Sequence, residues 1–73
     1  MKHKHYFKDV SYLETIDVYR VLSLYEVTDP CIQHAVKKLL VCGQRGSKPA
    51  EQDLQEAIDS LNRCIEMIKE DND

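Results

Sequence analysis

The sequence HAVKKLLVCGQRGSKP, residues 34–49, contains the end of one expected helix and the approach to the next. Its first half places apolar residues at helical spacing and puts cations on the other face. Gly43 is expected to end this helix, since glycine takes the left-handed backbone conformation without steric cost. Pro49, at the other end of the stretch, suits the first turn of a helix. The stretch therefore predicts two helices joined by a glycine-containing basic loop.

The 73 residues are expected to form one all-α domain, a small bundle of three helices of which two are short and one is long. Ser11 and Glu14 have the spacing of a capping box, which predicts the start of the first helix. Asp29 and Pro30 suit the N-cap and the first position of the second helix. In chain order, the expected boundaries are 1–10 for an N-terminal arm, 11–25 for the first helix, 30–42 for the second, 43–48 for the basic loop, 49–69 for the third helix and 70–73 for a frayed tail.

The apolar residues of the first expected helix spread around much of its circumference. A helix of this kind is usually covered on several sides, which two other helices cannot easily do. A core of this size supplies only about 3–5 kcal/mol of net stability. We therefore expect homo-oligomerisation to complete the core. The expected core stripes are Ile32, Ala35, Val36, Leu39 and Leu40 in the second helix and Leu54, Ala57, Ile58, Leu61, Ile65 and Ile68 in the third.

Composition restricts the class of protein. Ten basic and thirteen acidic residues give a net charge of -3, which argues against general binding of DNA or RNA. The three cysteines are an odd number at wide spacing, so we interpret them as small apolar residues rather than as disulfide partners. No apolar run approaches the ~20 residues of a membrane span. These features predict a cytoplasmic protein without a membrane partner.

The only concentration of positive charge lies between residues 37 and 48, which hold four bases and no acid. Phosphate binding needs cations and N–H donors on a concave backbone, which glycines and a helix start can supply. The simpler alternative is an ordinary helix connection with solvated charges. The candidate ligand-binding residues are Lys37, Lys38, Arg45 and Lys48, with His34 on the same helix face as the first two and with Tyr6 or Tyr12 to stack on a base. For the tyrosines, packing in a core or interface is the alternative.

Two E-x-x-D motifs provide a second candidate site. Residues three apart on a helix face the same way, so two such helices could chelate magnesium, as in all-α nucleoside triphosphate pyrophosphohydrolases. The four carboxylates are Glu14, Asp17, Glu56 and Asp59. No pair of nucleophile and base stands out, so we expect no catalytic residue and no cofactor, with magnesium required only if the protein is an enzyme. His3 and His5 could bind copper or nickel, although a solvated tail is the simpler interpretation.

Four stretches occur in an order that resembles a small helical domain family of bacteriophages whose function is unknown. They are HYFKDV, LETIDV, HAVKKLLVCGQRGSK and QDLQEAIDSLNRCIE. A related domain occurs in a T7-like phage protein described as a nucleotide kinase. The expected architecture is also similar to the phage anti-CBASS sponge proteins, small helical oligomers that sequester cyclic-nucleotide signals of host defence. The resemblance implies a phage protein of the host cytoplasm with a nucleotide-type ligand.

Three functional hypotheses remain open at this level. The first is a homo-oligomer that binds a nucleotide or cyclic nucleotide without turning it over. The second is an enzyme, either kinase-like or a magnesium-dependent pyrophosphohydrolase. The third is a protein-interaction module that inhibits a host protein through the tyrosine-rich first helix.

Overall fold

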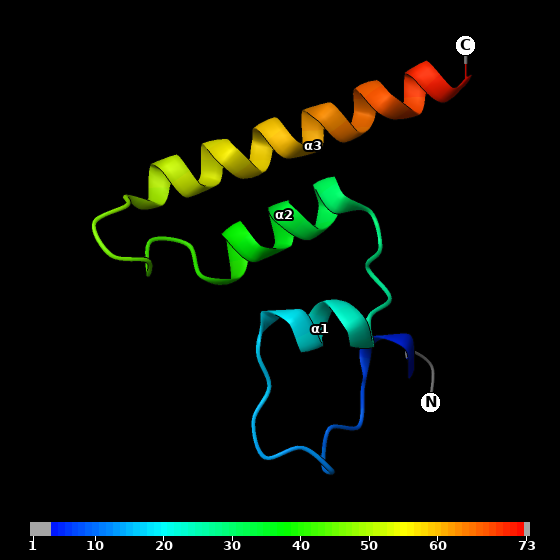
Figure 1. The fold of residues 1–73 in the computed structure, drawn as a ribbon, viewed down its shortest axis with the longest axis vertical. Coiled ribbons are helices and arrows are strands. Elements are labelled where there is room, and N and C mark those ends of the chain that lie inside the picture. Colours follow the sequence, from blue (N-terminus) through cyan, green and yellow to red (C-terminus); the bar gives the residue numbers. More distant parts are fainter. Residues whose placement is uncertain (1–3, 73) are drawn as a thin grey trace.

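A computed structural model describes residues 4–72 of the chain. Three α-helices, α1 (Val18–Leu24), α2 (Pro30–Leu40) and α3 (Ala50–Asn72), follow a short 3-10 helix, η1 (Lys4–Tyr6). No strand occurs within the described residues, so the predicted all-α class with one long and two short helices is confirmed. The helices α2 and α3 run antiparallel side by side, and α1 contacts α2 but not α3 (Figure 1).

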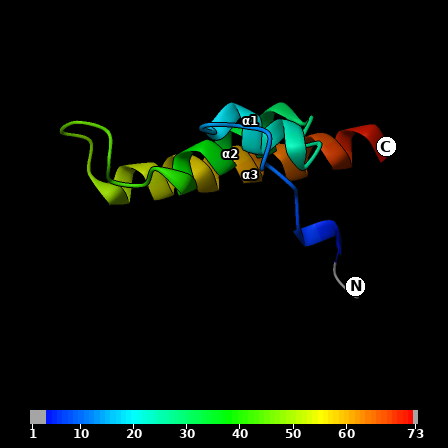
Figure 2. The ribbon, with the colours of Figure 1, turned by 90° about the horizontal axis from the view of Figure 1, so that it is seen from below.

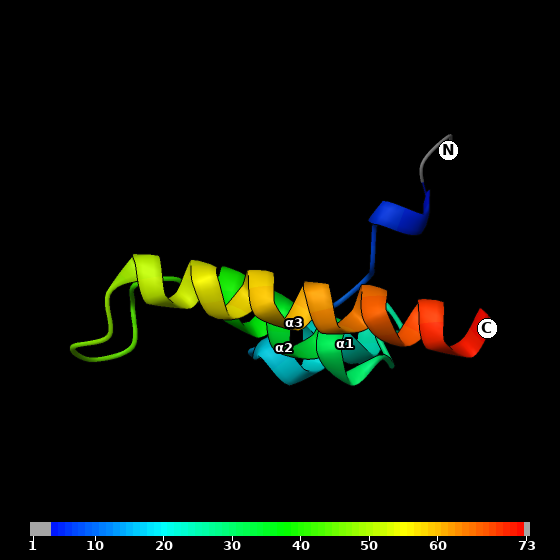
Figure 3. The same cartoon turned by 90° about the horizontal axis from the view of Figure 1, so that it is seen from above.

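The three helices form one layer rather than a bundle around a central core. Figures 2 and 3 show α1, α2 and α3 gathered in a thin slab, and the shortest dimension of the molecule is 20 Å. The radius of gyration is 14.9 Å, whereas a compact chain of this length would have a value of about 11 Å. The single chain is therefore markedly more open than a compact domain of its size.

The predicted start of the first helix at Ser11 is wrong. The helix α1 begins at Val18 because the side chain of Asp17 is its N-cap and accepts a hydrogen bond from the N–H of Arg20 at 2.9 Å. The Ser11 N–H instead donates to Asp9 Oδ1 at 2.9 Å within a turn. Thr15 and Ile16, directly before Asp17, are β-branched residues that lower helix propensity. The competing cap therefore reduces α1 to two turns.

The end of α1 is a Schellman motif with an unusual residue in the left-handed position. Glu26 has a φ of 54°, and its N–H donates to the Ser23 carbonyl at 3.1 Å. The next N–H, of Val27, donates to the Leu22 carbonyl at 2.9 Å. These two bonds satisfy the last carbonyls of α1 and reverse the chain towards α2. A glutamate here carries a backbone cost of about 1–2 kcal/mol that glycine would avoid.

The observed boundaries of α2 and α3 lie closer to the predicted ones than those of α1 do. Asp29 is the N-cap of α2 as predicted, since its Oδ1 accepts the N–H groups of Cys31 and Ile32 at 2.8 and 3.1 Å. The helix ends at Leu40, two residues before the predicted end, and Gly43 then takes a φ of 73°. The helix α3 continues to Asn72, so the prediction of a frayed tail from residue 70 is wrong for 70–72. Residue 73, like residues 1–3, lies outside the described residues.

Small residues rather than large ones form the contact between α2 and α3. Ala35, Ala57 and Cys64 are buried, and together with Leu22 of α1 they make up the apolar core of the described chain. The three cysteines are free, as expected. The larger part of the predicted core is not buried within the single chain, because most of its aliphatic side chains are about half exposed: Ile32, Leu39, Leu40, Leu54, Ile58, Leu61, Ile65 and Ile68.

Candidate functional site

A buried carboxylate holds the basic loop against the start of α3. Asp53, in the first turn of α3, has no exposed surface. Its Oδ2 accepts the Gly43 N–H at 2.8 Å, and its Oδ1 accepts Arg45 Nη2 at 2.8 Å. The Lys48 ammonium lies 3.7 Å from the same Oδ1. The Gly43 N–H, followed by the Arg45 guanidinium, lowers the pKa of Asp53 below its ordinary value, so this carboxylate is ionised where it stands.

A second carboxylate, one turn further along α3, binds two lysines. Glu56 Oε1 lies 2.5 Å from the Lys38 ammonium of α2 and 2.6 Å from that of Lys48. Gln52 donates its side-chain N–H to Oε2 of the same group at 3.1 Å. The hydrogen bonds from Lys38 and then Lys48 lower the pKa of Glu56 to about 2. We call the five charged groups Lys38, Arg45, Lys48, Asp53 and Glu56 the ion network.

The sequence assigned the ligand-binding roles to cations and missed the carboxylates that hold them. Arg45 is eight residues before Asp53, and Lys48 is eight residues before Glu56. This repeated spacing between a base in the loop and an acid in α3 is the sequence signal that could have indicated the network. Glu56 does appear among the sequence candidates, but as a metal ligand, whereas in the structure its neighbours are two ammonium groups.

Only three of the predicted ligand-binding residues come together, namely Lys38, Arg45 and Lys48. The expectation that His34, Lys37 and Lys38 share one solvent face is wrong, because Lys38 points to α3 and is 7% exposed. His34 Nδ1 lies 2.5 Å from Ser60 Oγ of α3. The Lys37 ammonium lies on the α1 side, 5.0 Å from the centre of the Tyr19 ring.

The two tyrosines proposed for base stacking lie in the N-terminal segment, away from the ion network. The carbonyl of Tyr6 accepts a hydrogen bond from the Tyr25 hydroxyl of the α1 C-cap at 2.8 Å. The Tyr6 ring also packs on the His5 ring, with centroids 4.1 Å apart. Tyr12 is 66% exposed in the irregular segment before α1. The hydrogen bond of Tyr6 thus connects the N-terminal arm to the end of α1. Neither tyrosine ring lies at the basic loop.

The proposed magnesium site does not assemble. Glu14 and Asp17 precede α1, so they do not share a helix face, and Asp17 serves as the N-cap. Asp59 accepts a hydrogen bond from Gln55 at 2.9 Å on the surface of α3. Across residues 4–72 no three histidine, cysteine or acidic side chains gather in a metal-binding group. His3, the other proposed metal ligand besides His5, lies outside the described residues.

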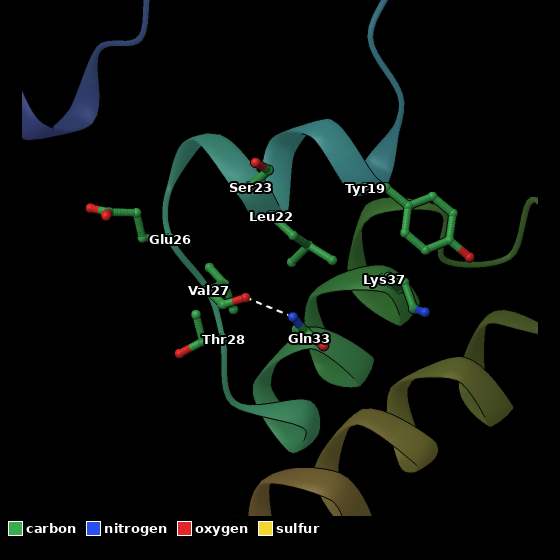
Figure 4. Close-up of a pocket in the computed structure, with 8 residues that line it drawn as sticks. All are labelled: Tyr19, Leu22, Ser23, Glu26, Val27, Thr28, Gln33 and Lys37. Atoms are coloured by element: carbon green, nitrogen blue, oxygen red, sulfur yellow. Dashed lines mark hydrogen bonds between the residues drawn. The ribbon is translucent and has the colours of Figure 1, made fainter.

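A pocket of about 420 Å³ lies between α1 and α2 (Figure 4). Leu22 and Val27 form its apolar part, and Tyr19 and Lys37 stand at one side of it. The side-chain N–H of Gln33 donates to the Val27 carbonyl at 2.8 Å, which fixes the amide and leaves its oxygen available as an acceptor. The pocket thus combines an aromatic ring, an ammonium group and an amide between α1 and α2, whereas Lys38 of α2 points to α3.

No family model, curated protein or solved structure matches the chain. Within the described residues, the helices are too short or too polar to cross a membrane.

The ion network predicts that stability falls in acid. The pKa of Glu56 is about 2 in the folded chain against an ordinary value of 4.5, and the pKa of Asp53 is lowered too. A carboxylate with a lowered pKa stabilises the fold fully above its unfolded pKa and loses this contribution as the pH falls towards the folded one. Urea unfolding should therefore show a constant free energy above about pH 5 and a decline towards pH 2.

The variant Glu56→Gln is the control for this pH dependence. It should be less stable than the original chain at pH 7, and its unfolding free energy should change less between pH 7 and pH 3, because one of the two titrating groups is gone. Equal pH dependence in both proteins would show that Glu56 is not engaged by the lysines.

Proposed function

We propose that the chain binds a phosphate-bearing ligand, a nucleotide or cyclic nucleotide, at the exposed side of the ion network. The observation that carries this proposal is the imbalance of the network, in which three cations meet two carboxylates and one positive charge is left over. A small anion responds to this local excess rather than to the net charge of the chain.

Arg45 is the residue best placed to meet a phosphate. Its side chain is 44% exposed, and its ion pair with Asp53 is made through Nη2. The rest of the guanidinium fork can donate to a phosphate in the bidentate geometry that arginine favours. Because Asp53 already holds the side chain, less conformational entropy is lost on binding than for a freely moving arginine.

The loop around Arg45 leaves room for a ligand. Gly46 has a φ of 63°, and a Cβ built on it would meet no atom within 4 Å. Lys48, with a side chain 25% exposed, stands next to this opening and is shared by both carboxylates. A phosphate at Arg45 would thus meet a second cation and an accessible backbone.

The resemblance of four sequence stretches to a phage domain family supports a more specific form of the proposal. In this form the protein is phage-encoded, acts in the host cytoplasm as a homo-oligomer, and sequesters a cyclic-nucleotide signal of host defence without converting it. A separate pocket, between α1 and α2, holds an aromatic ring and a further ammonium group, those of Tyr19 and Lys37.

Calorimetric titration with nucleoside mono-, di- and triphosphates, cyclic nucleotides and inorganic phosphate tests this function. We expect binding of at least one nucleotide and a loss of about 10- to 100-fold in affinity for Arg45→Ala, the range for a charged hydrogen bond. Arg63→Ala is the matched control, because Arg63 forms ion pairs with the surface residues Glu66 and Glu70 on α3, outside the ion network. Absence of heat with every ligand, or equal losses in both variants, would overturn the proposal.

A second candidate function is a protein-interaction module. It is favoured by the large aliphatic side chains on α2 and α3 that are about half exposed in the single chain. An apolar surface of this kind indicates a protein partner. The partner of this surface must itself be apolar where the two meet. A second copy of this chain has such a surface.

A further inference from the structure

The outward-facing side of α3 carries a second heptad stripe, distinct from the one that contacts α2. The residues towards α2 are at 53, 57, 60, 64 and 67, and all but Met67 are small or polar. The residue that follows each of these five is a large aliphatic one, so the same alternating spacing of four and three residues recurs. These residues are Leu54, Ile58, Leu61, Ile65 and Ile68. Their exposed fractions are 41–55%. An aliphatic repeat of this period is the pattern of a helix that packs on another helix.

Two of the three exposed aliphatic residues of α2, Ile32 and Leu39, lie on the same side of the layer. At 3.6 residues per turn, Ile32 and Leu39 are about a quarter-turn beyond the residues of α2 that face α3. The α3 stripe is likewise about a quarter-turn beyond the residues that face α2. Because α2 and α3 are antiparallel (Figure 1), the same rotation on each brings both sets to one face of the pair. We call these seven residues the aliphatic face.

A single layer with an aliphatic face lacks the second layer that a stable domain needs. The chain exposes 5956 Å², whereas a compact monomer of 8.5 kDa would expose about 4,700 Å². The excess of roughly 1,300 Å² is more than the ~800 Å² per partner that a standard protein interface buries. The uncovered surface is therefore large enough for a stable contact.

The charges beside the α3 stripe favour a second copy in one orientation. Along the outer edge of the stripe stand Glu51, Gln55, Asn62 and Lys69, in that order. The edge thus begins with an acid and ends with a base, and Glu66 lies just outside it, between Asn62 and Lys69 along the helix. In an antiparallel pair of α3 helices with Ile58 beside the partner's Leu61, Glu51 comes close to the partner's Lys69, at both ends. In a parallel two-fold pair this edge would instead face the opposite edge of the partner's stripe, so Glu51 and Lys69 would not meet across the contact.

We propose that the aliphatic face binds a second copy of this chain, face to face, with the two α3 helices antiparallel. The result is a two-layer particle in which the stripe of each α3 packs against that of the other. The contact lies on the aliphatic face, whereas Arg45 and Lys48 belong to the loop before α3, so this proposal does not depend on the phosphate ligand.

Sedimentation equilibrium over a range of concentrations tests the contact. We expect the original chain to have twice its single-chain mass, and Ile58→Lys to weaken the association by at least ~100-fold, because a two-fold contact would bury the new charge twice. Asp59→Lys is the matched control, since it places the same side chain on the polar side of the same turn and should leave the association unchanged. Ile58 is 50% exposed, so the helix content of Ile58→Lys, followed by circular dichroism, should stay the same.

Charge exchange tests the orientation. Glu51→Lys and Lys69→Glu should each weaken the association several-fold, and the double variant should regain most of the loss, because opposite charges face each other again. A single-chain mass for the original protein, or equal weakening by Ile58→Lys and Asp59→Lys, would overturn the proposal. Failure of the double variant to recover would overturn the antiparallel arrangement.

Discussion

Replacement of Asp53 by alanine is expected to lower the melting temperature by roughly 15 °C or more, the largest effect of any single substitution in the chain. Asp53 has no exposed surface and accepts from the Gly43 N–H and from Arg45. Its removal leaves a loop N–H and a guanidinium without their acceptor and opens a space at the start of α3. The loss exceeds that of a single surface bond because one fully buried carboxylate makes both contacts, and alanine leaves its space empty.

Thermal melts of the Asp53 variant should be compared at one fixed protein concentration, because association raises the apparent melting temperature. Asp59→Ala is the control, since Asp59 is an exposed acid on the same helix with a single hydrogen bond to Gln55. It should change the melting temperature by only a few degrees, about what a surface residue contributes. Similar melting temperatures for the two variants would mean that Asp53 does not hold the loop.

Gly43→Ala should be the second most damaging change, with a loss of at least about 2 kcal/mol in the free energy of unfolding. Two effects add at this position. The φ of 73° is a left-handed conformation that an L side chain rarely adopts, and a Cβ built on Gly43 would lie 3.2 Å from the Cβ of Ala50. The Gly43 N–H also donates to Asp53, so any backbone shift that relieves the contact weakens that bond.

Gly46→Ala separates the two effects. Gly46 has a similar φ of 63°, but a Cβ there would meet no atom within 4 Å. We therefore expect it to cost only the backbone term, about 1 kcal/mol. Urea unfolding at pH 7 measures both variants. Equal losses would show that the approach of the loop to Ala50 does not constrain Gly43.

Local chemistry made part of the fold predictable. Asp29 and Pro30 mark the start of α2 correctly because an N-cap and a first-turn proline act over a few residues. The predicted start of α1 was wrong because capping is so local. Ser11 and Asp17 are both good N-caps, and only tertiary context selects between them. Periodicity identified the aliphatic residues of α3, but it does not say which element covers them. In the structure, α2 packs against the small residues Ala57 and Cys64 of α3 and leaves the aliphatic residues exposed.

The cations of the candidate site were visible in the sequence, whereas their arrangement was not. Lys37 and Lys38 are neighbours in the chain, yet one lies over Tyr19 on the α1 side and the other contacts Glu56 of α3. The partners of Arg45 and Lys48 are acids eight residues later in a different element. Such pairs depend on how the loop folds back over α3, which no local pattern specifies. The structure thereby gives a structural role to three cations that the sequence suggested for a ligand alone.

Small-angle X-ray scattering of the original chain tests most directly whether this layer of helices needs a second copy. The mass from forward scattering should correspond to two chains, because the aliphatic face of each chain is then covered by the other. A particle with the mass of one chain and a radius of gyration near 11 Å, the value of a compact 73-residue domain, would contradict the account. It would mean that Ile58, Leu61 and Ile65 are buried within their own chain.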